Sequence, residues 1–208
     1  MIAQPQQSHM TPQEYLEWES HQQIRHEYIN GEVFAMAGGT RSHNRIAGNL
    51  YSSLDSYLQS RSCEIYFTDV KVQLSKSSAY HYPDLMVTYD PRDIEAEDRG
   101  NNLFVQYPCL IVEVLSPSTE AYDRGGKFMQ YRKLDTLQEY VLIQSELIGV
   151  ECFRKNSQGF WVLYPYEKGE TLTLESIGFS LPVEDLYRQV RFDLTEGSNQ
   201  SRESSHAT

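Results

Sequence analysis

The first third of the chain switches between helical and strand-like spacing of its apolar residues. Thr11-Pro12-Gln13-Glu14 is a capping box with proline at the first helical position, and it predicts a helix that runs to about Arg25. The stretch from Glu27 to Ala37 then alternates around Asn30-Gly31, a dipeptide that favours a two-residue hairpin. Ser42 is expected to cap a second helix, whose apolar residues recur at helical spacing at Ile46, Leu50, Leu54 and Tyr57/Leu58.

The middle of the chain predicts three strands and a helix. Val70, Val72 and Leu74 alternate as in a half-buried strand, and a short strand from Asp84 to Thr88 follows Pro83. The nearly unbroken apolar run from Cys109 to Leu115 is typical of a strand buried on both faces. A helix is expected from about Thr119 to Lys133.

The last third predicts more strands and a short closing helix. The strands are Glu139–Gln144, Val150–Lys155 and Phe160–Tyr164, and the last two are joined by a hairpin at residues 156–159. Pro182 opens the final helix. This order predicts one α/β domain over residues 11–192, with a central mixed β-sheet flanked by helices. Residues 1–10 and 193–208 are expected to be disordered tails, and Asp90–Asn102 a solvated acidic loop.

Composition narrows the class of protein. The 208 residues carry 18 basic and 29 acidic side chains, a net charge of −11, which argues against a protein that coats nucleic acid by bulk charge. It does not exclude an enzyme that reaches nucleic acid through a metal-filled cleft. No membrane span or secretory signal is recognisable, so a cytoplasmic protein is expected. Cys63, Cys109 and Cys152 lack metal-binding spacing, and we interpret them as core residues.

Glu113 is the most informative residue, because it interrupts the apolar strand Leu110–Leu115. A desolvated carboxylate costs several kcal/mol unless a buried cation compensates it, either a Lys or Arg side chain or a metal ion. Asp84 begins another apolar strand, 29 residues earlier. If the two carboxylates project to the same side of neighbouring strands, they repel each other unless a divalent cation lies between them. Mg²⁺ is commonly held by one or two carboxylates together with water and substrate phosphate.

Lys127 lies on the helix that follows Glu113, at i, i+4 spacing from Asp123 and Tyr131. One interpretation is a surface ion pair between Asp123 and Lys127, worth a few tenths of a kcal/mol. The other is catalytic, because a lysine beside a metal site can position a water molecule and stabilise charge on a phosphate.

These residues resemble a known group of enzymes. Pro83-Asp84 followed by Glu113 resembles the PD-(D/E)xK nuclease superfamily. The run Glu113–Thr119, followed by Asp123, Lys127 and Tyr131, is similar to one branch, the bacterial restriction endonucleases of the Uma-two type, formerly a domain of unknown function. The segments at residues 27–32 and 43–44 also resemble that branch, and the resemblance covers residues 11–187.

The resemblance implies a restriction-endonuclease-like core and a site with Asp84, Glu113 and Lys127 as catalytic residues. The superfamily pattern places lysine two residues after the acid, where this chain has Leu115, so the lysine role is expected to have moved to Lys127. Asp84 and Glu113 would hold Mg²⁺ or Mn²⁺. Glu27 is a candidate third metal ligand, with a surface hairpin position as the alternative. His43 is a candidate substrate-binding residue, with a simple place at the helix start as the alternative.

Two functions follow as hypotheses. The first is a metal-dependent endonuclease that hydrolyses phosphodiester bonds in DNA, acting as a homodimer because cutting both strands calls for two active sites. The second is a catalytically silent binding or assembly module on the same fold, linked to mobile elements. Retention of Asp84, Glu113 and Lys127 favours the first, and the acidic net charge keeps the second open.

Overall fold

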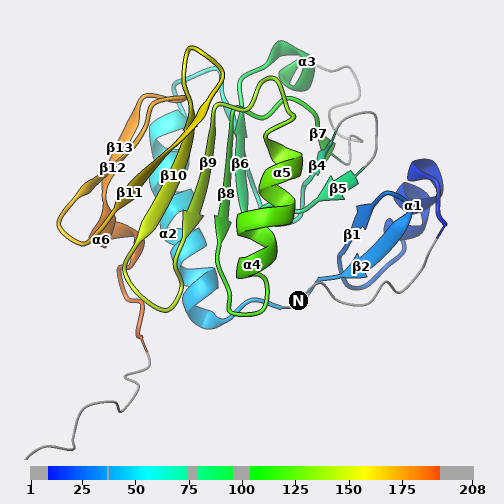
Figure 1. Cartoon of the computed structure of the whole chain (residues 1–208), viewed down its shortest axis with the longest axis horizontal. Helices are drawn as coiled ribbons and strands as arrows, with labels where there is room; N and C mark the ends of the chain where they lie inside the picture. Colours follow the sequence, from blue (N-terminus) through cyan, green and yellow to red (C-terminus); the bar gives the residue numbers. More distant parts are fainter. Residues whose placement is uncertain (1–8, 37, 75–78, 96–103, 193–208) are drawn as a thin grey trace, which may run out of the picture.

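The computed structural model describes residues 9–36, 38–74, 79–95 and 104–192, and it is the α/β fold expected from the sequence (Figure 1). Among these residues the larger sheet has six strands in the order β11-β10-β9-β8-β6-β3. Its strands are β3 (Glu64–Phe67), β6 (Leu85–Thr88), β8 (Leu110–Val114), β9 (Glu139–Ile143), β10 (Val150–Lys155) and β11 (Trp161–Tyr166). The sheet is mixed, because β8 and β9 are parallel whereas β6 and β8 are antiparallel.

A second sheet in the described part of the chain has five strands in the order β2-β1-β5-β4-β7. They are β1 (His26–Ile29), β2 (Glu32–Ala35), β4 (Lys71–Gln73), β5 (Ala79–His81) and β7 (Phe104–Val105). A separate pair is formed by β12 (Thr171–Leu174) and β13 (Phe179–Pro182). The hairpin predicted at Asn30-Gly31 is confirmed, and both residues have the positive φ that this tight turn requires.

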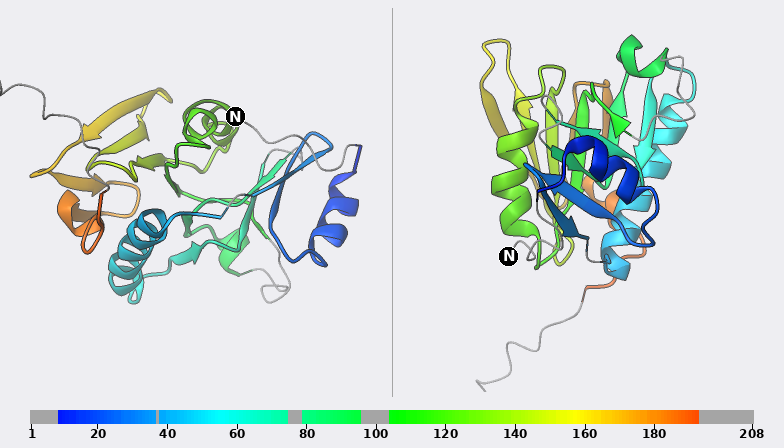
Figure 2. Two further views of the ribbon diagram at one scale, coloured as in Figure 1. Left: turned by 90° about the horizontal axis from the view of Figure 1, so that it is seen from below. Right: turned by 90° about the vertical axis from the view of Figure 1, so that its right-hand side faces the viewer.

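Helices lie on both faces of the larger sheet, and α1 packs against the smaller sheet (Figure 2). They are α1 (Pro12–Glu19), α2 (Arg41–Leu58), α3 (Pro91–Ile94), α4 (Glu120–Tyr122), the π-helical turn η2 (Asp123–Lys127), α5 (Phe128–Tyr131) and α6 (Val183–Leu186). Helix α2 packs on one face of the sheet, in a core that also includes β12, β13 and α6. Helix α5 packs on the opposite face, in a core shared with β4. Cys109 and Cys152 are buried and Cys63 is partly buried against the first core, as expected.

Alternation along β8 decides which way Glu113 points. Val112 and Val114 belong to the core under α2, whereas Ile111 and Leu115 belong to the core under α5. Successive side chains in a strand point to opposite faces, so Glu113 projects toward the α5 side with Ile111 and Leu115.

Three predicted boundaries differ from the structure. The first helix ends at Glu19 rather than near Arg25. Just after its end, the Ser20 hydroxyl donates a hydrogen bond to the Glu17 carbonyl and so competes with the backbone hydrogen bonds that would continue the helix. Thr40 rather than Ser42 caps α2, because its side chain accepts from the His43 amide. The helix predicted from Thr119 to Lys133 is interrupted by η2.

The predictions for the chain ends and the acidic loop fall mostly outside the described residues. Residues 1–8, 96–103 and 193–208 lie outside the residues that the structure describes. At the described start of the acidic loop, Asp90 caps the short helix α3.

Candidate active site

Asp84, Glu113 and Lys127 line one cavity of about 610 Å³. Asp84 lies between β5 of one sheet and β6 of the other, at the corner made by residues 82–84. Strand β8 pairs with β6 and carries Glu113, and the chain then turns through α4 to bring Lys127 back over the sheet. The three residues that the sequence singles out therefore converge, although 43 positions separate the first from the last.

The Asp84 carboxylate is oriented through one of its two oxygens. Its Oδ2 accepts a hydrogen bond of 2.7 Å from the Val114 amide and lies 3.1 Å from Nε2 of His43. The described residues make no hydrogen bond to Oδ1. Asp84 and Glu113 both line the cavity. Asp84 therefore presents an oriented carboxylate, with Oδ1 available to a ligand, at the same cavity as a second carboxylate.

Glu113 is held in the same way. Its side chain is buried, and its Oε1 accepts hydrogen bonds from Nζ of Lys127 at 3.1 Å and from the hydroxyl of Tyr131 at 3.0 Å. Both contacts fall on Oε1, so the described residues leave Oε2 without a hydrogen bond. The two hypotheses for Glu113, a buried salt bridge and a metal ligand, are therefore compatible in geometry.

Lys127 is surrounded by carboxylates. Besides Glu113, its Nζ lies 3.1 Å from Oε1 of Glu27 and 3.4 Å from Oδ1 of Asp123. Lys127 and Asp123 are 7% and 2% exposed, so the interpretation of Asp123–Lys127 as a surface pair is wrong. Asp123 lines the cavity, and its Oδ1 is close enough to Lys127 for an ion pair but lacks hydrogen-bond alignment.

The excess of carboxylates over cations is visible in the acid–base behaviour of the cluster. Burial opposes the charged form of Glu27, but Lys127 and His81 outweigh it and lower the pKa of Glu27 to about 2. Burial raises the pKa of Glu113 well above its ordinary range, and the Asp123, Asp84 and Glu27 charges add to the rise against the opposing effect of Lys127. Burial also raises the pKa of Asp123. One ammonium therefore does not satisfy all the acids around it.

Neighbouring carboxylates favour the charged forms of Lys127 and His43. Burial by itself lowers the pKa of Lys127, but Glu113 and Glu27 reverse that effect and raise the pKa well above its usual value. Burial likewise opposes protonation of His43, whereas its hydrogen bond and charge interaction with Asp84 raise the pKa overall.

The turn η2 brings Asp123 and Lys127 to the cluster. A π-helical turn has one more residue per hydrogen-bonded ring than an α-helix, and such turns are frequent at functional sites. The turn contains Gly125-Gly126, and a Cβ on Gly126 would come within 2.3 Å of the Tyr122 ring. The Tyr140 hydroxyl on β9 donates to the Asp123 carbonyl and fastens the turn to the sheet.

Glu27 and His43 are both brought close to the predicted site. Glu27 is buried on β1 and is not among the residues that line the cavity, so it does not occupy a surface hairpin position. His43 lines the cavity at the start of α2 and contacts Asp84. His81 was missed from sequence, because it is a buried polar residue with no motif around it. Tyr131 was singled out by its spacing from Lys127 and by the family resemblance, but its hydrogen bond to Glu113 was not predicted.

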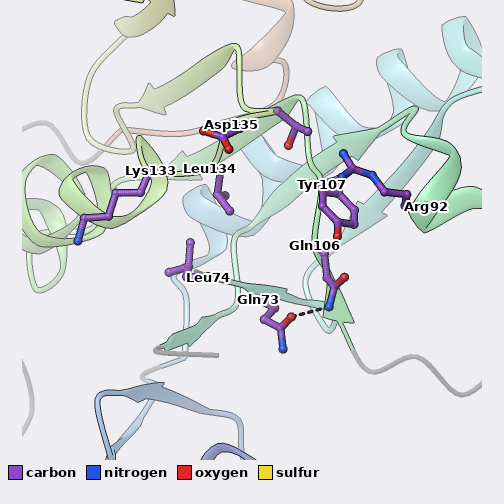
Figure 3. Close-up of a pocket in the computed structure, with 9 residues that line it drawn as sticks. Gln73, Leu74, Arg92, Gln106, Tyr107, Lys133, Leu134 and Asp135 are labelled. Carbon is purple, nitrogen blue, oxygen red and sulfur yellow. Dashed lines mark hydrogen bonds between the residues drawn. The ribbon is translucent and has the colours of Figure 1, made fainter. Parts of the chain in front are cut away.

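A second cavity, of about 360 Å³, contains none of the predicted site residues (Figure 3). It is lined in part by Gln73, Gln106, Lys133 and Asp135, and Gln106 donates a hydrogen bond to Gln73 across it. Asp135 is the one carboxylate among its lining residues, so this cavity has no counterpart of the Asp84–Glu113 pair.

Comparison with known proteins identifies the family of the chain. Residues 12–184 match the model of the Uma2 family, described as "Putative restriction endonuclease". The chain belongs to the Uma2 family. The matched segment includes every residue of the cluster around Lys127, and Uma2 membership together with the fold supports a nuclease.

Two proteins of Synechocystis sp. are similar to this Uma2 chain. Uncharacterized protein slr1290 is 43% identical over 183 residues, which cover 88% of this chain and 94% of that protein. Uncharacterized protein sll1609 is 35% identical over 155 residues, which cover 74% of this chain and 85% of that protein.

A solved structure shares the fold. The crystal structure of "a putative nuclease belonging to DUF820" from Anabaena variabilis matches with a TM-score of 0.72 at 18% identity, over 88% of this chain and 99% of that one. In the part of the chain that the structure describes, no helix has the length and apolar character needed to cross a membrane.

Proposed function

We propose that this protein is a metal-dependent endonuclease that hydrolyses phosphodiester bonds in DNA, with Asp84 and Glu113 as ligands of Mg²⁺ or Mn²⁺. One observation carries the proposal. The carboxylates of Asp84, just before β6, and of Glu113, on the paired strand β8, line one cavity together with Lys127, and each carboxylate keeps one oxygen without a hydrogen bond among the described residues.

The donor set fits a hard divalent cation. Mg²⁺ takes oxygen ligands and is usually bound by one or two carboxylates, with water and phosphate in the remaining positions. In the described part of the chain, no three His, Cys, Asp or Glu side chains group in a way that could hold a metal ion by themselves. The proposed site therefore relies on two carboxylates, with water and phosphate as the further ligands. Burial and the neighbouring carboxylates raise the pKa of Glu113, and a cation bound beside it would oppose that rise by favouring the ionised carboxylate.

The roles of the chain's own groups follow from their contacts. A bound divalent cation supplies charge that polarises the scissile phosphate and acidifies water. The Lys127 ammonium, held at the cavity, positions the attacking water and stabilises negative charge on the phosphate. The His43 imidazole orients Asp84 and offers positive charge to a neighbouring phosphate. Tyr131 donates a hydrogen bond to Oε1 of Glu113 and would orient the carboxylate, with Oε2 left to bind the cation.

We further propose that the protein acts as a cytoplasmic homodimer, since two active sites related by a two-fold axis can cut both strands of a duplex. Light scattering of the purified protein measures its mass directly. A dimer of the 24.1 kDa chain supports this part of the proposal, and a monomer that still cuts both strands contradicts it.

Cleavage assays test the activity itself. Purified protein with Mg²⁺ or Mn²⁺ is expected to nick or cut plasmid and linear DNA, and to lose the activity in EDTA. Glu113→Gln keeps the shape of the side chain but removes its charge, and should abolish cleavage. Asp135→Asn is the matched control, because it makes the same type of change at an exposed carboxylate in the second cavity.

The alternative of a catalytically silent module makes the opposite prediction. Wild-type protein would then fail to cleave any tested DNA with either metal, and Glu113→Gln would have no activity to remove. Equal cleavage by wild type and Glu113→Gln would assign the activity to a contaminant.

A further inference from the structure

Glu27 contacts Lys127 from outside the cavity. Its Oε1 lies 3.1 Å from Lys127 Nζ, the same distance that separates Nζ from Glu113. Glu113 lines the cavity and Glu27 does not. The ammonium is therefore shared between one carboxylate that faces the cavity and one that is enclosed by protein.

Both oxygens of Glu27 are engaged by protein groups. Oε1 also accepts a hydrogen bond of 3.2 Å from the Tyr82 amide. Oε2 lies 3.2 Å from Nδ1 of His81, a completely buried residue whose Nε2 lies 3.2 Å from Gln130. The His81 contact lies within ion-pair distance but lacks hydrogen-bond alignment. Among the described residues, Asp84 and Glu113 each keep one oxygen with neither a hydrogen bond nor an ion pair, whereas each oxygen of Glu27 lies within 3.2 Å of a protein nitrogen.

Charge repulsion explains why such an enclosed carboxylate is useful. An ammonium and a divalent cation that share Glu113 repel each other, since both are positive and both are desolvated. When Glu113 binds the divalent cation, Lys127 needs another counter-ion to remain at the cavity. Glu27 is in place at 3.1 Å, and the longer, poorly aligned contact with Asp123 is the weaker substitute.

We propose that Glu27 is a positioning residue that holds the Lys127 ammonium at the cavity when Glu113 binds a metal ion, and that Glu27 is not itself a metal ligand. This inference rests on the proposed function, because it assumes the cation site at Asp84 and Glu113. It assigns Glu27 a different role from the metal ligand expected from the sequence.

A double-mutant cycle separates the two roles. Glu27→Gln and Lys127→Gln are made singly and together, and kcat for DNA cleavage and Kd for Mn²⁺ are measured on each. If Glu27 acts through Lys127, Glu27→Gln lowers kcat by about tenfold or more in the wild type. It then lowers kcat by less than about twofold when Lys127 is already Gln.

Mn²⁺ binding by calorimetry needs no activity and decides the metal-ligand question. In the Lys127→Gln background, Glu27→Gln is expected to change the Kd by less than about threefold, whereas Asp84→Asn raises it by about tenfold or more. The inference is overturned if Glu27→Gln weakens Mn²⁺ binding as much as Asp84→Asn does, or if its effects on kcat multiply with those of Lys127→Gln.

The same measurements distinguish failure of the proposed function. If neither Asp84→Asn nor Glu113→Gln changes the Mn²⁺ Kd, the cation site itself is misplaced. Thermal unfolding of each variant verifies folding. Glu113 and Asp123 lose their ammonium in Lys127→Gln and in the double variant alike, so the comparison of these two variants isolates the effect of Glu27.

Discussion

At Glu113, burial and charge act against each other. The carboxylate is 4% exposed and has one ammonium contact, but that ammonium also serves Glu27 and Asp123. The pKa of Glu113 is therefore raised in the folded chain. The native state consequently holds this proton more tightly than the unfolded chain does, and stability declines as pH rises from the ordinary value of 4.5 toward the raised one.

The first prediction concerns Glu113→Gln in metal-free protein. Gln does not ionise, and Lys127 retains two other carboxylates. The free energy of unfolding of the variant at pH 8 should therefore be at least that of the wild type and up to about 1 kcal/mol higher. Adding Mg²⁺ at about a hundredfold excess over its Kd should stabilise the wild type by about 3 kcal/mol and leave the variant unchanged. Urea unfolding with and without Mg²⁺ measures both. If Mg²⁺ stabilises the variant as much as the wild type, Glu113 is not a ligand of the cation.

The second prediction concerns Glu27, whose pKa is lowered from 4.5 to about 2. A lowered carboxylate pKa adds stability that is fully present above pH 4.5 and is lost as pH falls toward about 2, in this case about 3 kcal/mol. Glu27→Gln should lack this dependence, so its stability curve should be flatter across that interval. Unfolding at a series of pH values compares the two curves. Parallel curves would refute the ion pair.

At the scale of elements, η2 holds the cluster together. Asp123 and Lys127 lie at opposite ends of this turn, and both reach the same group of carboxylates. Its two adjacent glycines differ in surroundings. A Cβ on Gly126 would meet the Tyr122 ring, whereas a Cβ on Gly125 would have no atom within 4 Å.

The third prediction uses that difference. Gly126→Ala should destabilise the protein by about 1–3 kcal/mol and lower the cleavage rate, because Tyr122 and the turn that carries Lys127 must move. Gly125→Ala is the matched control and should be neutral or stabilising by up to about 1 kcal/mol, because alanine costs less backbone entropy. Thermal unfolding and cleavage assays compare the two. Equal effects would show that the contact with Tyr122 is unimportant.

At the scale of the whole molecule, the charge of −11 opposes the approach of DNA. Three carboxylates, those of Asp84, Glu113 and Asp123, line the same cavity as Lys127 and His43. Phosphate can enter this region favourably only when additional positive charge compensates those acids.

The fourth prediction follows from that balance. At constant ionic strength, duplex DNA should bind the wild type about tenfold more tightly with Mg²⁺ than with EDTA, and Glu113→Gln should lose most of this difference. Fluorescence anisotropy of labelled DNA measures the affinities. Tight binding in EDTA would show that DNA is held elsewhere on the surface.

The sequence alone determined what depends on neighbouring residues. The capping box at Thr11 and the Asn30-Gly31 turn were predictable because their hydrogen bonds and φ angles are local. The burial of Glu113 was predictable because its strand is apolar on both faces. The resemblance to the Uma2 family was likewise recognisable from the run Glu113–Thr119 followed by Asp123, Lys127 and Tyr131.

Tertiary structure decided everything that depends on which distant surfaces meet. The i, i+4 spacing of Asp123 and Lys127 is the same on a solvated and a buried helix face, so the pattern could not distinguish a surface pair from a buried cluster. Glu27 reaches Lys127 across 100 residues of sequence, and His81 stands behind it on β5. Those contacts exist because the chain passes from one sheet to the other between β5 and β6, beside β8. The spacing of apolar residues along the sequence does not indicate that crossing.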